Sequence, residues 1–233
     1  MESQAAFTSS TSWCINGSCA TAIFQDLYRL HKLSSVLQKS SVALQEISVN
    51  ASIASDHSGH GSKVFKEIAK QIGLLSVLLN DEIKKMDSHL SIMIKSLLQV
   101  IGKLSRKRKL IRCMNFLGPS KNYMHVYNVQ ETLGLEVDVT LDETHAELVF
   151  MKIELERFKQ LVNRVWSIEI SLRVSATTVH SGDEIFYLSI AEAMKSMATE
   201  TSVVLDDVAK LNNSVDIRLI NRCGCIKGVK NGL

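Results

Sequence analysis

Residues 141–179 read LDETHAELVFMKIELERFKQLVNRVWSIEISLRVSATTV, and the spacing of apolar residues in this stretch decides the fold class. Apolar side chains recur every seven residues in two rows, which is the a/d pattern of helices that pack along one another. Only Glu169 interrupts the rows with a charge. The first row is Leu141, Leu148, Leu155 and Val162, and the second is Met151, Phe158, Val165, Leu172 and Val179.

Three other stretches carry the same seven-residue repeat, so we expect four long helices. The rows are Ile23, Leu30, Leu37, Leu44 and Ala51 in the first stretch, Phe65, Ile72, Leu79, Met86, Met93 and Val100 in the second, and Ile190, Met197, Val204 and Leu211 in the fourth. The predicted fold is all-α, with two long antiparallel helical hairpins packed as an elongated four-helix coiled-coil bundle.

The predicted hairpins occupy residues 22–112, with a turn near Gly59, and residues 141–221, with a turn near Gly182. Residues 113–140 contain the only proline and are predicted to be the connector. Residues 1–21 and 222–233 lack the repeat and are predicted to be flexible ends. An arm of about 37 residues would be about 55 Å long, because each helical residue adds about 1.5 Å.

Composition disfavours other fold classes. The chain has 233 residues, of which 45% are hydrophobic, but it has only one proline and 11 glycines. Sandwiches, barrels and doubly wound α/β folds need more of these turn-forming residues. The net charge of +3 is ordinary for a globular protein and does not indicate a dedicated nucleic-acid binder.

The cysteines and the absence of a signal sequence favour a cytoplasmic location. The N-terminus has no basic region followed by an apolar core, so we expect the five thiols to be reduced. No uncharged apolar run approaches the length of about 18 residues that spans a bilayer. The cysteine spacing fits no paired Cys-x-x-Cys site, and we predict neither a metal nor a cofactor.

The two predicted turns share a sequence repeat. Residues 46–49 read EISV and residues 57–59 read HSG, whereas residues 169–172 read EISL and residues 180–182 read HSG. The match resumes one residue out of step after each glycine, with residues 68–69 against residues 190–191. Either the hairpin is duplicated or two serine-rich turns have converged.

The first turn resembles the hairpin tip of the cytoplasmic signalling domain of methyl-accepting chemotaxis receptors. The resemblance rests on residues 47–53, which read ISVNASI, followed by Gly59, Phe65 and Ala69. It implies a cytoplasmic signalling or array protein that is not an enzyme and whose tips bind chemoreceptors, the coupling protein or the histidine kinase. The family's tip glutamate falls on Ala54 and Thr177 here, and its arginine falls on His57 and His180.

The resemblance also implies which residues contact partners, in the first turn and at the corresponding positions of the second. They are Val49, Asn50, Ile53, Ala54, His57, Phe65, Leu172, Arg173, Ala176, Thr177, His180 and Phe186. The alternative to a signalling role is a structural coiled-coil adaptor that has no chemotaxis partner. Self-association is compatible with both roles.

No catalytic residues or phosphate-binding loop can be recognised, so we expect no enzymatic activity and no small-molecule substrate. The histidines near the turns, His57, His60 and His180, have two interpretations. They could form a weak metal site, or they could belong to a polar surface. Residues 106–109, which are Arg106, Lys107, Arg108 and Lys109, would attract anionic lipid at a membrane surface or form a solvated helix end. Nucleic-acid binding is not expected, because no groove-reading motif accompanies these residues.

Overall fold

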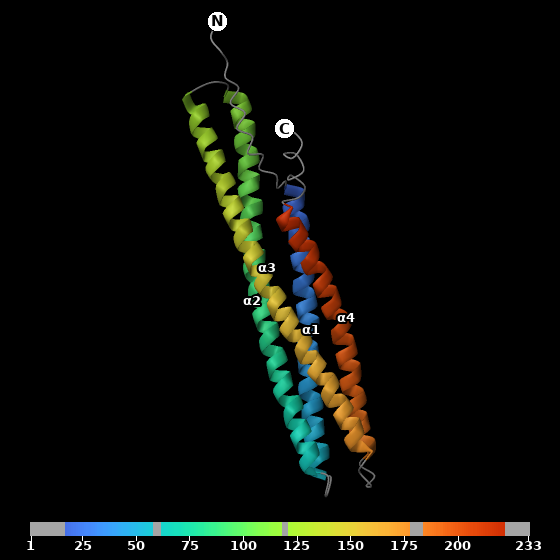
Figure 1. The fold of residues 1–233 in the computed structure, drawn as a ribbon. Coiled ribbons are helices and arrows are strands. Elements are labelled where there is room, and N and C mark those ends of the chain that lie inside the picture. Colours follow the sequence, from blue (N-terminus) through green and yellow to red (C-terminus); the bar gives the residue numbers. More distant parts are fainter. Residues whose placement is uncertain (1–16, 58–61, 118–120, 178–183, 222–233) are drawn as a thin grey trace, which may run out of the picture.

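Four long helices make up the computed structural model, which describes residues 17–57, 62–117, 121–177 and 184–221. The helices are α1 (Gly17–His57), α2 (Ser62–Leu117), α3 (Lys121–Ala176) and α4 (Glu184–Ile220). Figure 1 shows them side by side as a narrow rod. No strand occurs within the described ranges. The predicted all-α class is therefore confirmed.

The helices form an up-down-up-down bundle in which each helix contacts two neighbours. α1 packs on α2 and α4, and α3 packs on the same two helices, so these are the helix pairs whose backbones lie closest together. α1 and α3 end, and α2 and α4 begin, at the same end of the rod (Figure 1). One chain thus builds a complete four-helix bundle from two hairpins.

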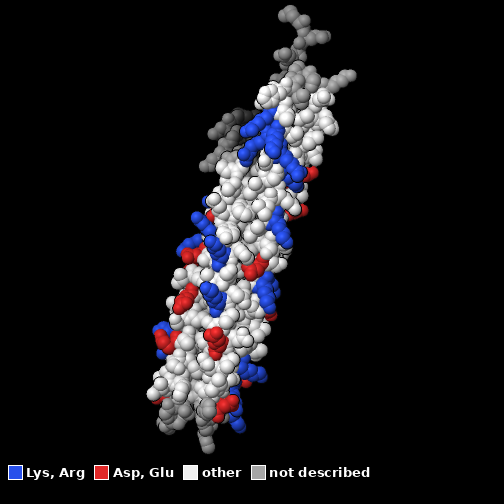
Figure 2. All heavy atoms as spheres, turned by 180° about the vertical axis from the view of Figure 1, so that it is seen from behind, with Lys and Arg blue, Asp and Glu red and all other residues white. Residues whose placement is uncertain are grey.

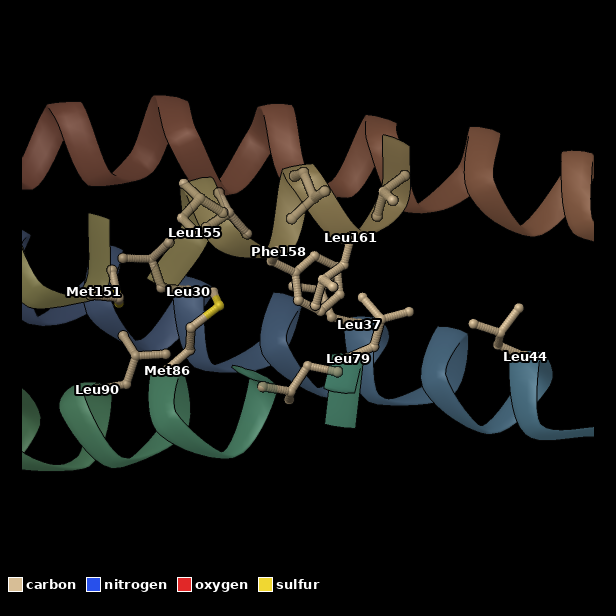
Figure 3. Packing of buried hydrophobic residues seen from close by; sticks show 14 of the residues in the cluster. Leu30, Leu37, Leu44, Leu79, Met86, Leu90, Met151, Leu155, Phe158 and Leu161 are labelled. Carbon is tan, nitrogen blue, oxygen red and sulfur yellow. The ribbon is translucent and has the colours of Figure 1, made fainter. Parts of the chain in front are cut away.

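The seven-residue rows form the core. Leu37, Leu79 and Phe158 are fully buried. Figure 3 shows side chains of α1, α2 and α3 pointing into the space between the helices. Burying an aliphatic or aromatic side chain contributes about 1.5–3 kcal/mol. Helices of this length gain most of their stability from such packing rather than from helix propensity.

The predicted connector at residues 113–140 is wrong for most of its length, because α2 and α3 continue through it as helices. Only residues 118–120, which include Pro119, lie between the two helices and outside the described residues. On α3, Gly134, Val137 and Thr140 are buried and extend the core stripe before Leu141. At 56 residues each, α2 and α3 are about 84 Å long, and they extend past α1 and α4 in Figure 1.

The predicted reduced state of the thiols is wrong for Cys19, which is disulfide-bonded. Cys113 is an exposed free thiol. The bond to Cys19 removes the support that the cysteines gave to a cytoplasmic location, because disulfides are typical of oxidising compartments. No described helix is long and apolar enough to cross a membrane.

Small and polar side chains bring α1 and α2 close together. Ser41 Oγ donates a hydrogen bond to the carbonyl oxygen of Ser76 at 3.1 Å, and Ser48 Oγ donates to that of Ala69 at 3.0 Å. A Cβ atom at Gly73 would lie 2.9 Å from Ser48 Oγ, so a larger residue would displace the hydroxyl that donates to Ala69. These contacts stabilise the hairpin near its turn.

Asp216 joins α4 to α3. Its carboxylate accepts a hydrogen bond from Lys152 Nζ at 2.5 Å and lies 2.9 Å from His145 Nε2. Burial acts to raise the pKa of Asp216, but the Lys152 ammonium and then His145 more than offset this and leave the pKa below its usual value. A carboxylate with a lowered folded-state pKa stabilises the fold above the unfolded-state pKa, and this stability is lost as the pH falls through the folded-state pKa.

We predict that Asp216→Asn lowers the free energy of unfolding by about 1.5–3 kcal/mol at pH 7, because it removes hydrogen bonds to a charged group. The difference from the unaltered chain should begin to shrink below about pH 4, near the pKa of Asp216 in the unfolded chain, and should be lost as the pH falls through the lower folded-state pKa. Urea unfolding followed by circular dichroism across this pH range measures both effects. Asp207→Asn, which removes an exposed pair with Lys210, is the matched control and should change the free energy little. A difference for Asp216→Asn that is constant with pH would contradict the prediction.

A second prediction concerns the core. Phe158→Ala removes a fully buried ring and should lower the free energy of unfolding by about 3–5 kcal/mol. Phe116→Ala, at a ring that is 90% exposed, should change it by less than about 0.5 kcal/mol. Thermal and urea unfolding of both variants would test this contrast, and equal losses would show that the core is not where the structure places it.

Candidate partner-binding surface at the hairpin tips

An apolar groove lies between α1 and α4 near the two turns. We call it the tip groove, and its volume is about 490 Å³. α1 contributes residues from the last three helical turns before its end, and α4 contributes residues from its first three turns. The lining residues are Ile47, Asn50, Ile53 and Ala54 from α1 and Phe186, Ser189, Ile190 and Ala193 from α4.

The rim of the tip groove exposes large apolar side chains. Ile53 is 53% exposed and Phe186 is 61% exposed, although each sits beside a complete bundle core. Asn50 is also exposed and supplies a hydrogen-bonding amide beside this apolar surface. A concave apolar surface with a small number of polar groups is typical of a binding site.

Two stacked aromatic rings connect the hairpins close to the tip groove. The ring centroids of Phe65 on α2 and Tyr187 on α4 lie 3.4 Å apart, and the ring planes differ by 10°. Tyr187 Oη lies 3.5 Å from the carbonyl oxygen of Ala54 and donates to it. Both rings are buried, so the stack holds α1, α2 and α4 together beneath the surface.

The sequence repeat accounts for this stack. At an offset of 122 residues, the buried positions of α2 and α4 coincide, and Phe65 corresponds to Tyr187. The other corresponding pairs include Ile68 and Ile190, Ala69 and Ala191, Ile72 and Met194, Ile83 and Leu205, Met86 and Val208, and Met93 and Val215. The helices that follow the two turns are therefore equivalent, and equivalent aromatic residues meet in the centre.

The helices that precede the turns are not equivalent in this way. At the sequence offset of 123 residues, Ile47 is 8% exposed whereas Ile170 is 58% exposed. Ile53 is exposed whereas Ala176 is fully buried. The matched EISV and EISL segments thus turn different faces toward the core, and the repeat before the turns does not correspond to a structural repeat.

The structure brings only some of the predicted partner-binding residues to the surface. Those that are exposed are Val49, Asn50, Ile53, Thr177 and Phe186, and Ala54 is half-buried. Phe65, Leu172 and Ala176 lie in the core instead, because they occupy the heptad rows of α2 and α3. The side chain of His57 and the whole of His180 lie outside the described residues.

Arg173 is held by carboxylates of its own chain. Its guanidinium donates to Glu169, which is buried, and to Glu192 of α4 at 2.5 Å. The hydrogen bond to Glu169 and then that to Glu192 raise the pKa of Arg173, and Arg173 in turn lowers the pKa of Glu192. The structure thus places Arg173 in a contact between α3 and α4.

Sequence reasoning missed Tyr187, Ser189, Ile190 and Ala193 as residues of the tip. The signal that would have found them is the offset of 122 residues after the turns, which pairs Phe65 with Tyr187 rather than with Phe186. The described residues contain no group of three or more His, Cys, Asp or Glu side chains that could hold a metal ion. The histidine cluster predicted near the turns falls largely outside the described residues.

No protein-family model, curated protein or solved structure matches the chain. The resemblance to chemoreceptor tips therefore rests on the residues quoted for it.

We predict that the aromatic stack couples the two hairpins energetically. In a double-mutant cycle of Phe65→Leu and Tyr187→Leu, the interaction energy should be about 0.5–1.5 kcal/mol beyond the separate losses of buried area. Free energies of urea unfolding for the four proteins give this value. A second cycle that combines Phe65→Leu with Phe158→Leu should be additive, because Phe158 lies several helical turns away. Additivity in the first cycle would contradict the predicted coupling.

Proposed function

We propose that the chain is a non-enzymatic cytoplasmic signalling or array protein that binds chemotaxis receptors, the coupling protein or the histidine kinase through the tip groove. The observation that supports this most directly is the position of Asn50, Ile53 and Ala54. These residues belong to the segment that resembles a chemoreceptor tip, and all three line the groove with Phe186 of the second hairpin.

The exposed apolar residues of the tip groove give the proposal its energetic basis. Covering a side chain such as Ile53 or Phe186 with a partner contributes up to about 1.5–3 kcal/mol. Apolar side chains that become buried near the centre of an interface often dominate the affinity of the complex. An apolar side chain from a partner would fill the groove, and the amide of Asn50 would orient it.

The bundle architecture fits the same role. A receptor signalling domain reaches a four-helix bundle by dimerisation, whereas this chain reaches one with two hairpins of its own. α1 ends and α4 begins at the same end of the rod, so their groove residues are presented together (Figure 1). A monomer of this kind would join an array without a second copy.

Ile53→Asp and Phe186→Ser should each weaken binding of the purified coupling protein, histidine kinase or receptor signalling domain by about tenfold or more. Each change removes an apolar contact, and the first also places a charge in the groove. Isothermal titration calorimetry with each purified partner measures the affinity.

Val203→Asp is the matched control, because Val203 is 60% exposed on α4 and lies about 25 Å from the start of the groove along the helix. It should leave the affinity unchanged, and circular dichroism should show the same helix content in all variants. If the unaltered chain binds none of the three partners, the signalling role is rejected in favour of the structural coiled-coil adaptor.

A further inference from the structure

Positive charge is concentrated at the end of the rod opposite the tips. No Asp or Glu occurs between Asp87 and Glu131, whereas this stretch contains eight Lys and Arg residues. The rest of the chain has 19 Lys and Arg against 24 Asp and Glu and is therefore net negative. Figure 2 shows Lys and Arg gathered on one face near this end, whereas both signs alternate farther along the rod.

Some of these cations stabilise the fold. Lys103 Nζ lies 3.1 Å from Glu136 of α3. Lys107 faces Asp138, and partial burial lowers the pKa of Lys107. Arg108 packs over the start of α1, where a Cβ atom at Gly17 would lie 1.6 Å from its Nη2 atom. These side chains are engaged with other helices.

Three other cations point to solvent. Arg106, Lys109 and Arg112 are exposed, and none of the three forms an ion pair within the described residues. Lys109, Arg112 and Phe116 are spaced at i, i+3 and i+7, so they share one face of α2. Unpaired cations on one helix face form a surface for an anionic partner.

Large apolar side chains accompany the cations at this end. Phe116 at the end of α2 is 90% exposed, and Met124 at the start of α3 is 62% exposed. Tyr123 beside Met124 is 38% exposed. Exposed rings and aliphatic side chains next to Lys and Arg are typical of proteins that lie on lipid bilayers, where the cations meet head groups and the apolar groups enter the interface.

We infer that this end of the α2–α3 pair binds the surface of a bilayer that contains anionic phospholipids. Arg106, Lys109 and Arg112 would neutralise lipid phosphates, and Phe116 and Met124 would insert between head groups. A lipid surface fits better than nucleic acid, because the exposed side chains of Phe116 and Met124 stand where α2 ends and α3 begins rather than along a helix that could enter a groove of DNA. The inference uses residues at the opposite end from the tip groove and does not depend on the proposed function.

The test is co-sedimentation of the full chain with vesicles of phosphatidylcholine alone or of phosphatidylcholine mixed equally with phosphatidylglycerol. The unaltered chain should bind only the mixed vesicles, and added salt should weaken this binding. A variant with Arg106→Gln, Lys109→Gln and Arg112→Gln should bind the mixed vesicles about 100-fold more weakly, because each cation near the surface contributes about fivefold. Phe116→Ser should weaken binding without changing its dependence on salt.

The matched control carries Lys63→Gln, Lys70→Gln and Lys84→Gln, which remove the same charge from exposed positions nearer the turn of α2. This control should bind the mixed vesicles as tightly as the unaltered chain. The inference is overturned if the control loses as much binding as the Arg106 triple variant, if neutral vesicles bind equally well, or if no vesicle binds. Binding of double-stranded DNA without binding of mixed vesicles would also overturn it, since the surface would then recognise nucleic acid.

Discussion

The apolar stripe of α2 is the constraint on which the rest of the bundle depends. It is buried from Phe65 to Leu104, and α2 packs on both α1 and α3. α2 joins the first hairpin to the second through α3, which is equally long. α4 then closes the bundle between α3 and α1. The groove at the tips exists only because this packing brings α4 beside α1.

An apolar stripe alone does not fix how far one helix is shifted along another. Similar apolar side chains recur every seven residues in both helices, so several shifts would bury them equally well. Polar contacts between α2 and α3 supply that register. His89 Nδ1 lies 2.6 Å from Glu147, and Lys85 contacts Glu82 and approaches Glu154 to 4.0 Å. Burial, and then the hydrogen bond with Glu154, raise the pKa of Glu82. The pKa of Glu154 is lowered, mainly by its hydrogen bond with Glu82. This carboxylate pair, in which Glu154 is buried and Glu82 half-buried beside Lys85, favours one alignment of the two longest helices.

The helical rows could be predicted from the sequence because an unbroken period of seven leaves little choice of structure. The ends of α2 and α3 could not, since Gly134 and Thr140 do not look like core residues even though they are buried. At the tip, sequence similarity located the segment but not the face that it exposes. Ile47 and Ile170 match in sequence, yet a rotation of the helix buries one and exposes the other. The burial of Phe65 likewise depends on Tyr187, a residue from the other hairpin.

The unequal hairpins make the tip of this chain one-sided. A symmetric dimer presents each surface twice, because the same patch occurs on both subunits. Here Ser189 and Ala193, which line the tip groove, correspond on α2 to Glu67 and Gln71 at the offset of 122 residues. Gln71 Nε2 donates to Glu67 at 3.3 Å, and both side chains are exposed, so the equivalent face is polar. An apolar segment that fits the tip groove would therefore meet polar side chains at the equivalent positions of α2, so the two sides of the tip are not interchangeable as binding surfaces.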